Sequence, residues 1–125
     1  MDVRNQPEAE RGLPLVDARR HPRHKLEVEL QVISRTCGLI KGNTVDISES
    51  GIAATFMEEV PLGEVVRLEF TLSLGHVEVH AVVRQRNAFR YGFEFLEASH
   101  VPAMEIIRRT CRELAVERFL SRRRR

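Results

Sequence analysis

A short polar segment of sequence DISESG, which begins at Asp46, holds the residue types best suited to ligand chemistry. Side chains two positions apart on a strand share a face, so Asp46 and Ser48 should point outward together. By the same alternation Val45 and Ile47 should point into the core. An outward carboxylate can accept two hydrogen bonds from the N1 and N2 edge of guanine, and a neighbouring hydroxyl can bond the same base.

Gly51 closes this segment and would permit either a positive φ in a turn or the close approach of a ligand to the backbone. The alternative interpretation is structural. In a simple hairpin turn, Asp46 and Ser48 would do no more than satisfy backbone amides.

A basic cluster of sequence RRHPRHK, residues 19–25, lies before the first predicted strand. Arg19 and Arg23 form an RxxxR pair, with Pro22 limiting the conformations between them. Arginine presents a planar fork of donors that matches phosphates and the Hoogsteen edge of guanine. The spacing alone is weak, because it recurs in a chain whose 20 basic residues include 18 arginines. A solvated basic linker is the alternative.

Length and composition limit the class of protein. The 125 residues predict one domain, since domains hold about 100 to 200 residues. Twenty basic against 18 acidic residues leave a net charge of +2, so any anion site must be local. Two cysteines without metal-binding spacing fit a reduced compartment, and we expect a cytoplasmic protein. No apolar run approaches the roughly 18 residues of a membrane span.

The apolar pattern changes period along the chain and divides it into elements. Residues 1–17 show no periodicity and predict a flexible arm. Between residues 26 and 96 the pattern alternates, which predicts six strands near residues 26–32, 39–48, 51–56, 66–72, 77–84 and 91–95. The brief turns between them leave no room for helical crossovers, so an antiparallel barrel or sandwich is expected.

Near residue 100 the apolar residues begin to recur at steps of three and four, which predicts an amphipathic helix to about residue 120. Its apolar stripe should cover an open barrel end or meet the helix of a second copy in a homodimer. A basic tail follows at residues 122–125.

Taken together, these motifs resemble the PilZ domain. An RxxxR pair (Arg19, Arg23) is followed by DxSxxG (Asp46, Ser48, Gly51), then by further strands and a final helix. The resemblance implies a mainly β fold, a six-stranded antiparallel PilZ-type barrel with a C-terminal α-helix, in a domain over residues 18–121. Members of that family bind the bacterial second messenger cyclic di-GMP.

By the same resemblance, Arg19 and Arg23 would clamp the phosphates and guanine Hoogsteen edges, with Arg20 assisting. Asp46, Ser48 and Gly51 would line a guanine pocket on the barrel side. The expected ligand is cyclic di-GMP, with no cofactor and no metal; His76 and His80, which share a strand face, should lie about 13 Å apart.

The function expected is that of a bacterial cyclic di-GMP receptor that orders its N-terminal arginine arm on the barrel and so signals to an unidentified downstream protein. No nucleophile elbow, P-loop or HExxH motif is present, so an enzyme is not expected. One alternative is a PilZ-like module that binds protein and no nucleotide. The other, a nucleic-acid binder using the C-terminal arginines, is less favoured because exposed aromatic residues for base stacking are lacking.

Overall fold

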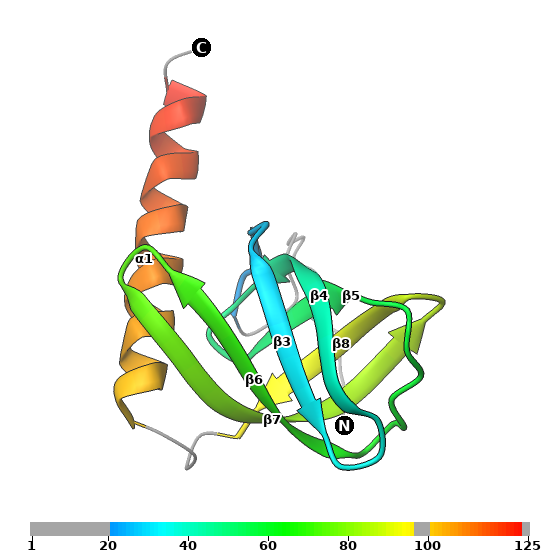
Figure 1. Cartoon of the computed structure of the whole chain (residues 1–125). Coiled ribbons are helices and arrows are strands. Elements are labelled where there is room, and N and C mark those ends of the chain that lie inside the picture. The colour runs from blue at the N-terminus through cyan, green and yellow to red at the C-terminus, as the bar shows by residue number, and fades with distance from the viewer. Residues whose placement is uncertain (1–20, 97–100, 124–125) are drawn as a thin grey trace, which may run out of the picture.

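Strands dominate the part of the chain that the computed structural model describes, residues 21–96 and 101–123 (Figure 1). In chain order the elements are β2 (His24–Lys25), β3 (Glu29–Ser34), β4 (Gly38–Ile47), β5 (Gly51–Thr55), β6 (Val65–Leu72), β7 (Gly75–Asn87), β8 (Arg90–Phe95) and α1 (Val101–Arg123).

Six of these strands close into a barrel. All neighbouring pairs are antiparallel in the order β4-β3-β6-β7-β8-β5, and a further pairing of β5 with β4 completes the ring. Closure leaves no free edge among these strands, because each backbone ladder has a partner on both sides. The predicted six-stranded antiparallel barrel with a C-terminal helix is confirmed.

The short strand β2 has no counterpart among the predicted strands. It lies against the end of β4, where His24 pairs with Ile47 and Lys25 with Asp46. The alternating pattern predicted one strand from residue 26, whereas β3 begins at Glu29. Between β2 and β3 the side chain of Thr44 interrupts the ladder: its hydroxyl accepts from the Val28 N–H at 2.9 Å and donates to the Leu26 carbonyl at 2.7 Å.

A bulge in β4 decides which side chains face outward near Asp46. Between Thr44 and Asp46 the pairing with β5 advances by one residue on β5 and by two on β4. Such a bulge turns the following side chains to the other face. Thr44 is buried before the bulge and Ile47 after it, so the expectation that Val45 points into the core is wrong: Val45 is half-buried and lines a surface pocket.

The barrel interior is filled by apolar residues from all six barrel strands, with an aromatic cluster on one side. The ring of Tyr91 stacks on Phe56 with centroids 4.2 Å apart and planes 12° from parallel. The Tyr91 hydroxyl donates to the Glu58 carbonyl at 2.8 Å and accepts from the Val60 N–H at 3.1 Å. These bonds hold the loop that follows β5 against the barrel.

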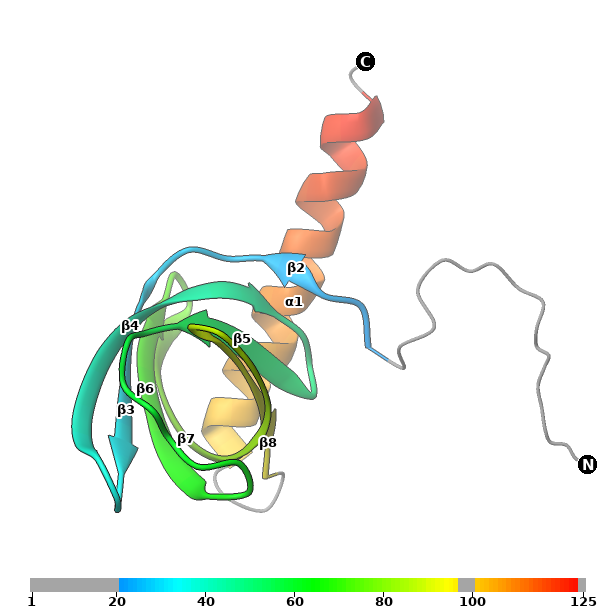
Figure 2. The ribbon, with the colours of Figure 1, turned by 90° about the vertical axis from the view of Figure 1, so that its right-hand side faces the viewer.

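Helix α1 covers one end of the barrel with the first half of its length. Ala103, Met104, Ile107 and Cys111 are buried and belong to the same core as the strands. Figure 2 looks through the ring of strands and shows α1 crossing behind its opening. The apolar stripe therefore packs on its own barrel, the first of the two sequence-based alternatives.

The second half of α1 extends beyond the barrel, as Figures 1 and 2 show. The side chains described for residues 115–122 are all exposed. Among the described residues no helix is long and apolar enough to cross a membrane.

Candidate functional site

The carboxylate of Asp46 lies between two arginines from different parts of the chain. Arg90 donates from Nη2 to Asp46 Oδ2 at 3.0 Å, and Arg23 Nη1 lies 3.8 Å from Asp46 Oδ1. The Asp46 side chain is only 17% exposed, so these ion pairs are partly shielded from solvent. Partial burial strengthens the attraction between the charges relative to a pair in open water.

Three local features bring these groups together. The bulge in β4 turns Asp46 outward at the strand end, as described above. The pairing of β2 with β4 sets Lys25 opposite Asp46, which places Arg23 just beyond the carboxylate. Arg90 begins β8 and pairs with Thr55 of β5, the neighbour of β4. The site therefore spans three neighbouring strands and the segment that leads into them.

Ser48 has a different environment from Asp46. It is buried, and its hydroxyl accepts from the backbone N–H of Ser50 at 3.2 Å and of Gly51 at 3.1 Å. The Ser48 N–H in turn donates to the Gly51 carbonyl at 2.8 Å. Ser48 thus fixes the turn between β4 and β5, which is the structural role that the alternative interpretation gave it. Asp46 does not have that role, because it pairs with arginines instead of backbone amides.

Gly51 meets a steric requirement of the barrel. A Cβ atom built there would lie 2.3 Å from the carbonyl oxygen of Phe93 on β8, a backbone atom. Its φ is not among the positive values found at other glycines. The close approach that the sequence suggested is therefore that of the neighbouring strand.

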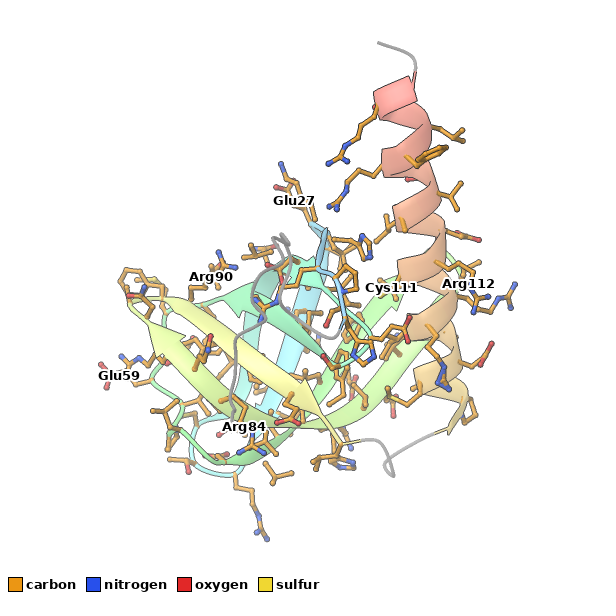
Figure 3. All side chains as sticks on the ribbon, turned by 180° about the vertical axis from the view of Figure 1, so that it is seen from behind. Glu27, Glu59, Arg84, Arg90, Cys111 and Arg112 are labelled. Carbon is orange, nitrogen blue, oxygen red and sulfur yellow. The ribbon has the colours of Figure 1, made fainter. Side chains whose placement is uncertain are left out.

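Three surface pockets open around Arg23, whose side chain lines all of them. The first, of about 730 Å³, is also lined by Asp46 and Arg90. The second, of about 680 Å³, includes Arg90 and Gly92, and the third, of about 200 Å³, includes Ser48, Gly51 and Gly92. Their shared residues make one continuous surface over β5 and β8, the side of the barrel seen in Figure 3. It offers cations, a carboxylate and small side chains to a flat anionic ligand.

The structure brings some of the predicted site residues close together. Arg23 and Asp46 are in contact, and Ser48 and Gly51 line a pocket that Arg23 also lines. Arg19 and Arg20, like the predicted arm of residues 1–17, lie outside the described residues. Arg90 was missed, because only the pairing of β8 with β5 brings it to Asp46, 44 residues away in sequence.

Helix α1 reaches the same site from the far side of β2. Arg118 Nη1 donates to the carbonyl oxygen of Arg23 at 3.5 Å, a long hydrogen bond. Next to it, His24 is buried and its Nδ1 has no hydrogen-bond partner among the described residues. Burial lowers the pKa of His24 below 6.5, and the charge of Arg118 lowers it further against the opposing effect of Glu49.

One group of potential metal ligands lies elsewhere on the barrel. Ligand atoms of Glu69, His76 and Glu78 come within 4.8 Å of one another on the outer face of β6 and β7. Each already has a partner, since Arg67 pairs with Glu69 at 2.9 Å and His76 Nε2 lies 3.6 Å from Glu78. This group could not be predicted from sequence spacing, because the pairing of β6 with β7 assembles it.

The match to known proteins agrees with this architecture. The family model of the PilZ domain matches residues 17–113, and the chain belongs to that family. None of the curated proteins compared with the chain matches it.

Solved structures show the same fold. The PilZ domain of Escherichia coli YcgR with c-di-GMP has a TM-score of 0.65 and 17% identity, over 81% of this chain and 94% of its own. The Bacillus subtilis inhibitor of motility (MotI/DgrA) has a TM-score of 0.68 and 22% identity, over 86% of this chain and 54% of its own. K. pneumonia MrkH in its apo state has a TM-score of 0.68 and 15% identity, over 90% of this chain and 55% of its own. The chain thus spans just over half the length of the last two.

The Gly51→Ala substitution should lower the free energy of unfolding by about 2 to 3 kcal/mol, because the new methyl group forces β5 and β8 apart. Urea denaturation measures this change. Gly92→Ala is the matched control, since its Cβ would meet Gln85 at an ordinary 3.4 Å, and it should cost less than about 1 kcal/mol. Equal stability of Gly51→Ala and wild type would contradict the steric role.

Protonation of His24 should destabilise the fold. Because its folded pKa lies below the ordinary 6.5, the unfolded chain binds the proton more readily; the stabilisation is complete above pH 6.5 and is lost as the pH falls through the folded pKa. Urea midpoints measured across this range should fall less steeply in His24→Phe than in wild type. An unchanged slope in His24→Phe would show that His24 does not cause it.

Proposed function

We propose that this chain is a cyclic di-GMP receptor. The observation that carries the proposal is the contact of Arg23 with Asp46, which joins the RxxxR segment to the DxSxxG segment at one surface. The family match and a structural neighbour whose PilZ domain was solved with c-di-GMP support the same ligand. Because this ligand is a bacterial second messenger, we place the protein in the bacterial cytoplasm.

The chemistry of the ligand fits the groups present. Cyclic di-GMP carries two phosphates and two guanines, and an arginine guanidinium can both pair with a phosphate and stack on a purine. Arg23 would take this role together with Arg19 and Arg20. Asp46 would accept the N1 and N2 protons of one guanine. The small pocket beside Ser48 and Gly51 would receive part of the ligand surface.

Arg90 has a distinct role in this scheme. It pairs with Asp46 at 3.0 Å, and that carboxylate has a second cation, Arg23, only 3.8 Å away. When the guanine edge donates its hydrogen bonds to the Asp46 carboxylate, one or both arginines are displaced and can pair with the ligand phosphates. The ion pairs therefore hold both cations beside the carboxylate before the ligand arrives, and the loss of these pairs is part of the cost of binding.

The signal in this proposal is the ordering of the arginine arm that precedes β2, from about residue 10, against the barrel, a change that a downstream protein reads. One half of the site, including Asp46, lies on the closed barrel. The other half belongs to the segment that leads into β2, so ligand contacts to both would join them. Coupling of this kind is a recognised form of molecular switch. No chemical step is involved, and the chain acts as a binding adaptor.

Replacing Arg23 by Ala should weaken cyclic di-GMP binding by about 1.5 to 3 kcal/mol, the loss expected for a charge-assisted contact. Isothermal titration calorimetry measures the affinity and also the stoichiometry. Arg35→Ala is the matched control, because Arg35 is exposed in the turn between β3 and β4, and it should bind as wild type does.

Wild-type affinity in Arg23→Ala would remove Arg23 from the site. If the wild-type chain gives neither heat nor thermal stabilisation with saturating cyclic di-GMP, the alternative holds, and the chain is a PilZ-like interaction module without a nucleotide.

Amide hydrogen exchange of residues 19–23 should slow when saturating cyclic di-GMP is added, because the arm then makes contacts that limit its opening. Mass spectrometry of peptides from this segment measures the effect, with a peptide from β6 as the internal control. Unchanged exchange in the presence of calorimetric binding would contradict the switching mechanism and leave the receptor function intact.

A further inference from the structure

The exposed half of α1 presents apolar side chains that the barrel does not cover. Val116, Phe119 and Leu120 are 52%, 57% and 48% exposed. They follow the i, i+3, i+4 spacing that places side chains on one stripe of a helix. Val116 and Leu120 of this stripe, at the end of a projecting helix, are exposed to contact with another surface.

This stripe faces away from the barrel. Each of its members lies nine residues after a buried residue of α1: Ile107 precedes Val116, Thr110 precedes Phe119, and Cys111 precedes Leu120. Nine residues make two and a half turns at 3.6 residues per turn, so the two sets point in opposite directions. The barrel therefore cannot cover the stripe, and it also leaves the approach to the stripe open.

Arginines extend the same face toward the barrel end of the helix. Arg112 precedes Val116 by about one turn and Arg109 by about two turns. Both are exposed, and neither has an acidic partner among the described residues. Figure 3 shows the labelled Arg112 on the side of α1 away from the barrel. From residue 108 to the end, the chain holds eight arginines, two glutamates and no lysine.

This charge distribution favours one occupant over another. Two parallel copies of α1 joined through this face would bring their arginines together, where like charges repel, and two antiparallel copies would set the arginines of one against the apolar side chains of the other. A surface of phosphate groups has the opposite charge and matches the guanidinium fork. An apolar stripe flanked by arginines is also the pattern of helices that lie in the interface of a lipid bilayer.

We propose that the outward face of α1, formed by Arg109, Arg112, Val116, Phe119 and Leu120, binds the surface of an anionic lipid bilayer. The arginines pair with lipid phosphates while the apolar side chains enter the region below the headgroups. Because the barrel lies on the opposite side of the helix, a flat membrane meets this face without touching the strands. This binding is peripheral and independent of the nucleotide function proposed above.

Co-sedimentation of the full chain with vesicles tests the proposal. Wild type should bind vesicles of equal parts phosphatidylglycerol and phosphatidylcholine, should fail to bind phosphatidylcholine alone, and should dissociate as salt is raised. Val116→Gln with Leu120→Gln should weaken partitioning about tenfold through lost apolar burial. Arg109→Gln with Arg112→Gln should also weaken it about tenfold through lost charge.

The control variant joins Leu39→Gln and Met57→Gln, two exposed apolar residues of the barrel that are 60% and 71% exposed. It should partition as wild type does, and circular dichroism should show equal helix content in all variants. The proposal would be overturned by no binding of wild type to anionic vesicles, by wild-type partitioning of Val116→Gln with Leu120→Gln, or by a dimer in solution that this double variant dissociates. A partner protein that binds this face in place of the vesicles would do the same.

Discussion

The arrangement around Asp46 depends on the neutralisation of one partly buried carboxylate by Arg23 and Arg90. Burying a carboxylate costs free energy unless its charge is paired. Here the partners come from the segment before β2 and from the start of β8. The same pairing thus stabilises the strand end and gathers positive charge on one surface. The groups that satisfy Asp46 in this fold are the groups that the proposed phosphate-bearing ligand would need.

The barrel could be predicted from the sequence because each strand has one face in the core, and the alternation of Leu30, Val32 and their counterparts records that burial. β2 could not be predicted, because two residues are too few to show an alternating pattern and they owe their strand conformation to the pairing with β4. The bulge at Val45 could not be predicted for a related reason, because a bulge is defined by the register of the partner strand. Features set by long-range pairing leave little trace in local patterns.

The candidate site shows the same division. Asp46 and Arg23 could be singled out from residue types and spacing, and the structure brings them into contact. The sequence left two roles open for Ser48, and the backbone geometry of the turn at Gly51 shows that its hydroxyl accepts from backbone amides. The RxxxR spacing at Arg90 also occurs at several other arginines, so spacing could not single it out. Only the order of the strands shows that Arg90 lies beside Asp46.

The long hydrogen bond from Arg118 to the Arg23 carbonyl gives α1 a part in a region that it does not line. The side chain of Arg23 faces the pockets while its carbonyl is held by the helix, so one residue serves two elements at once. Shortening the chain before residue 118 would take away this support. In a truncated form Arg23 would be held less firmly than in the intact molecule, although every pocket-lining residue remained in place.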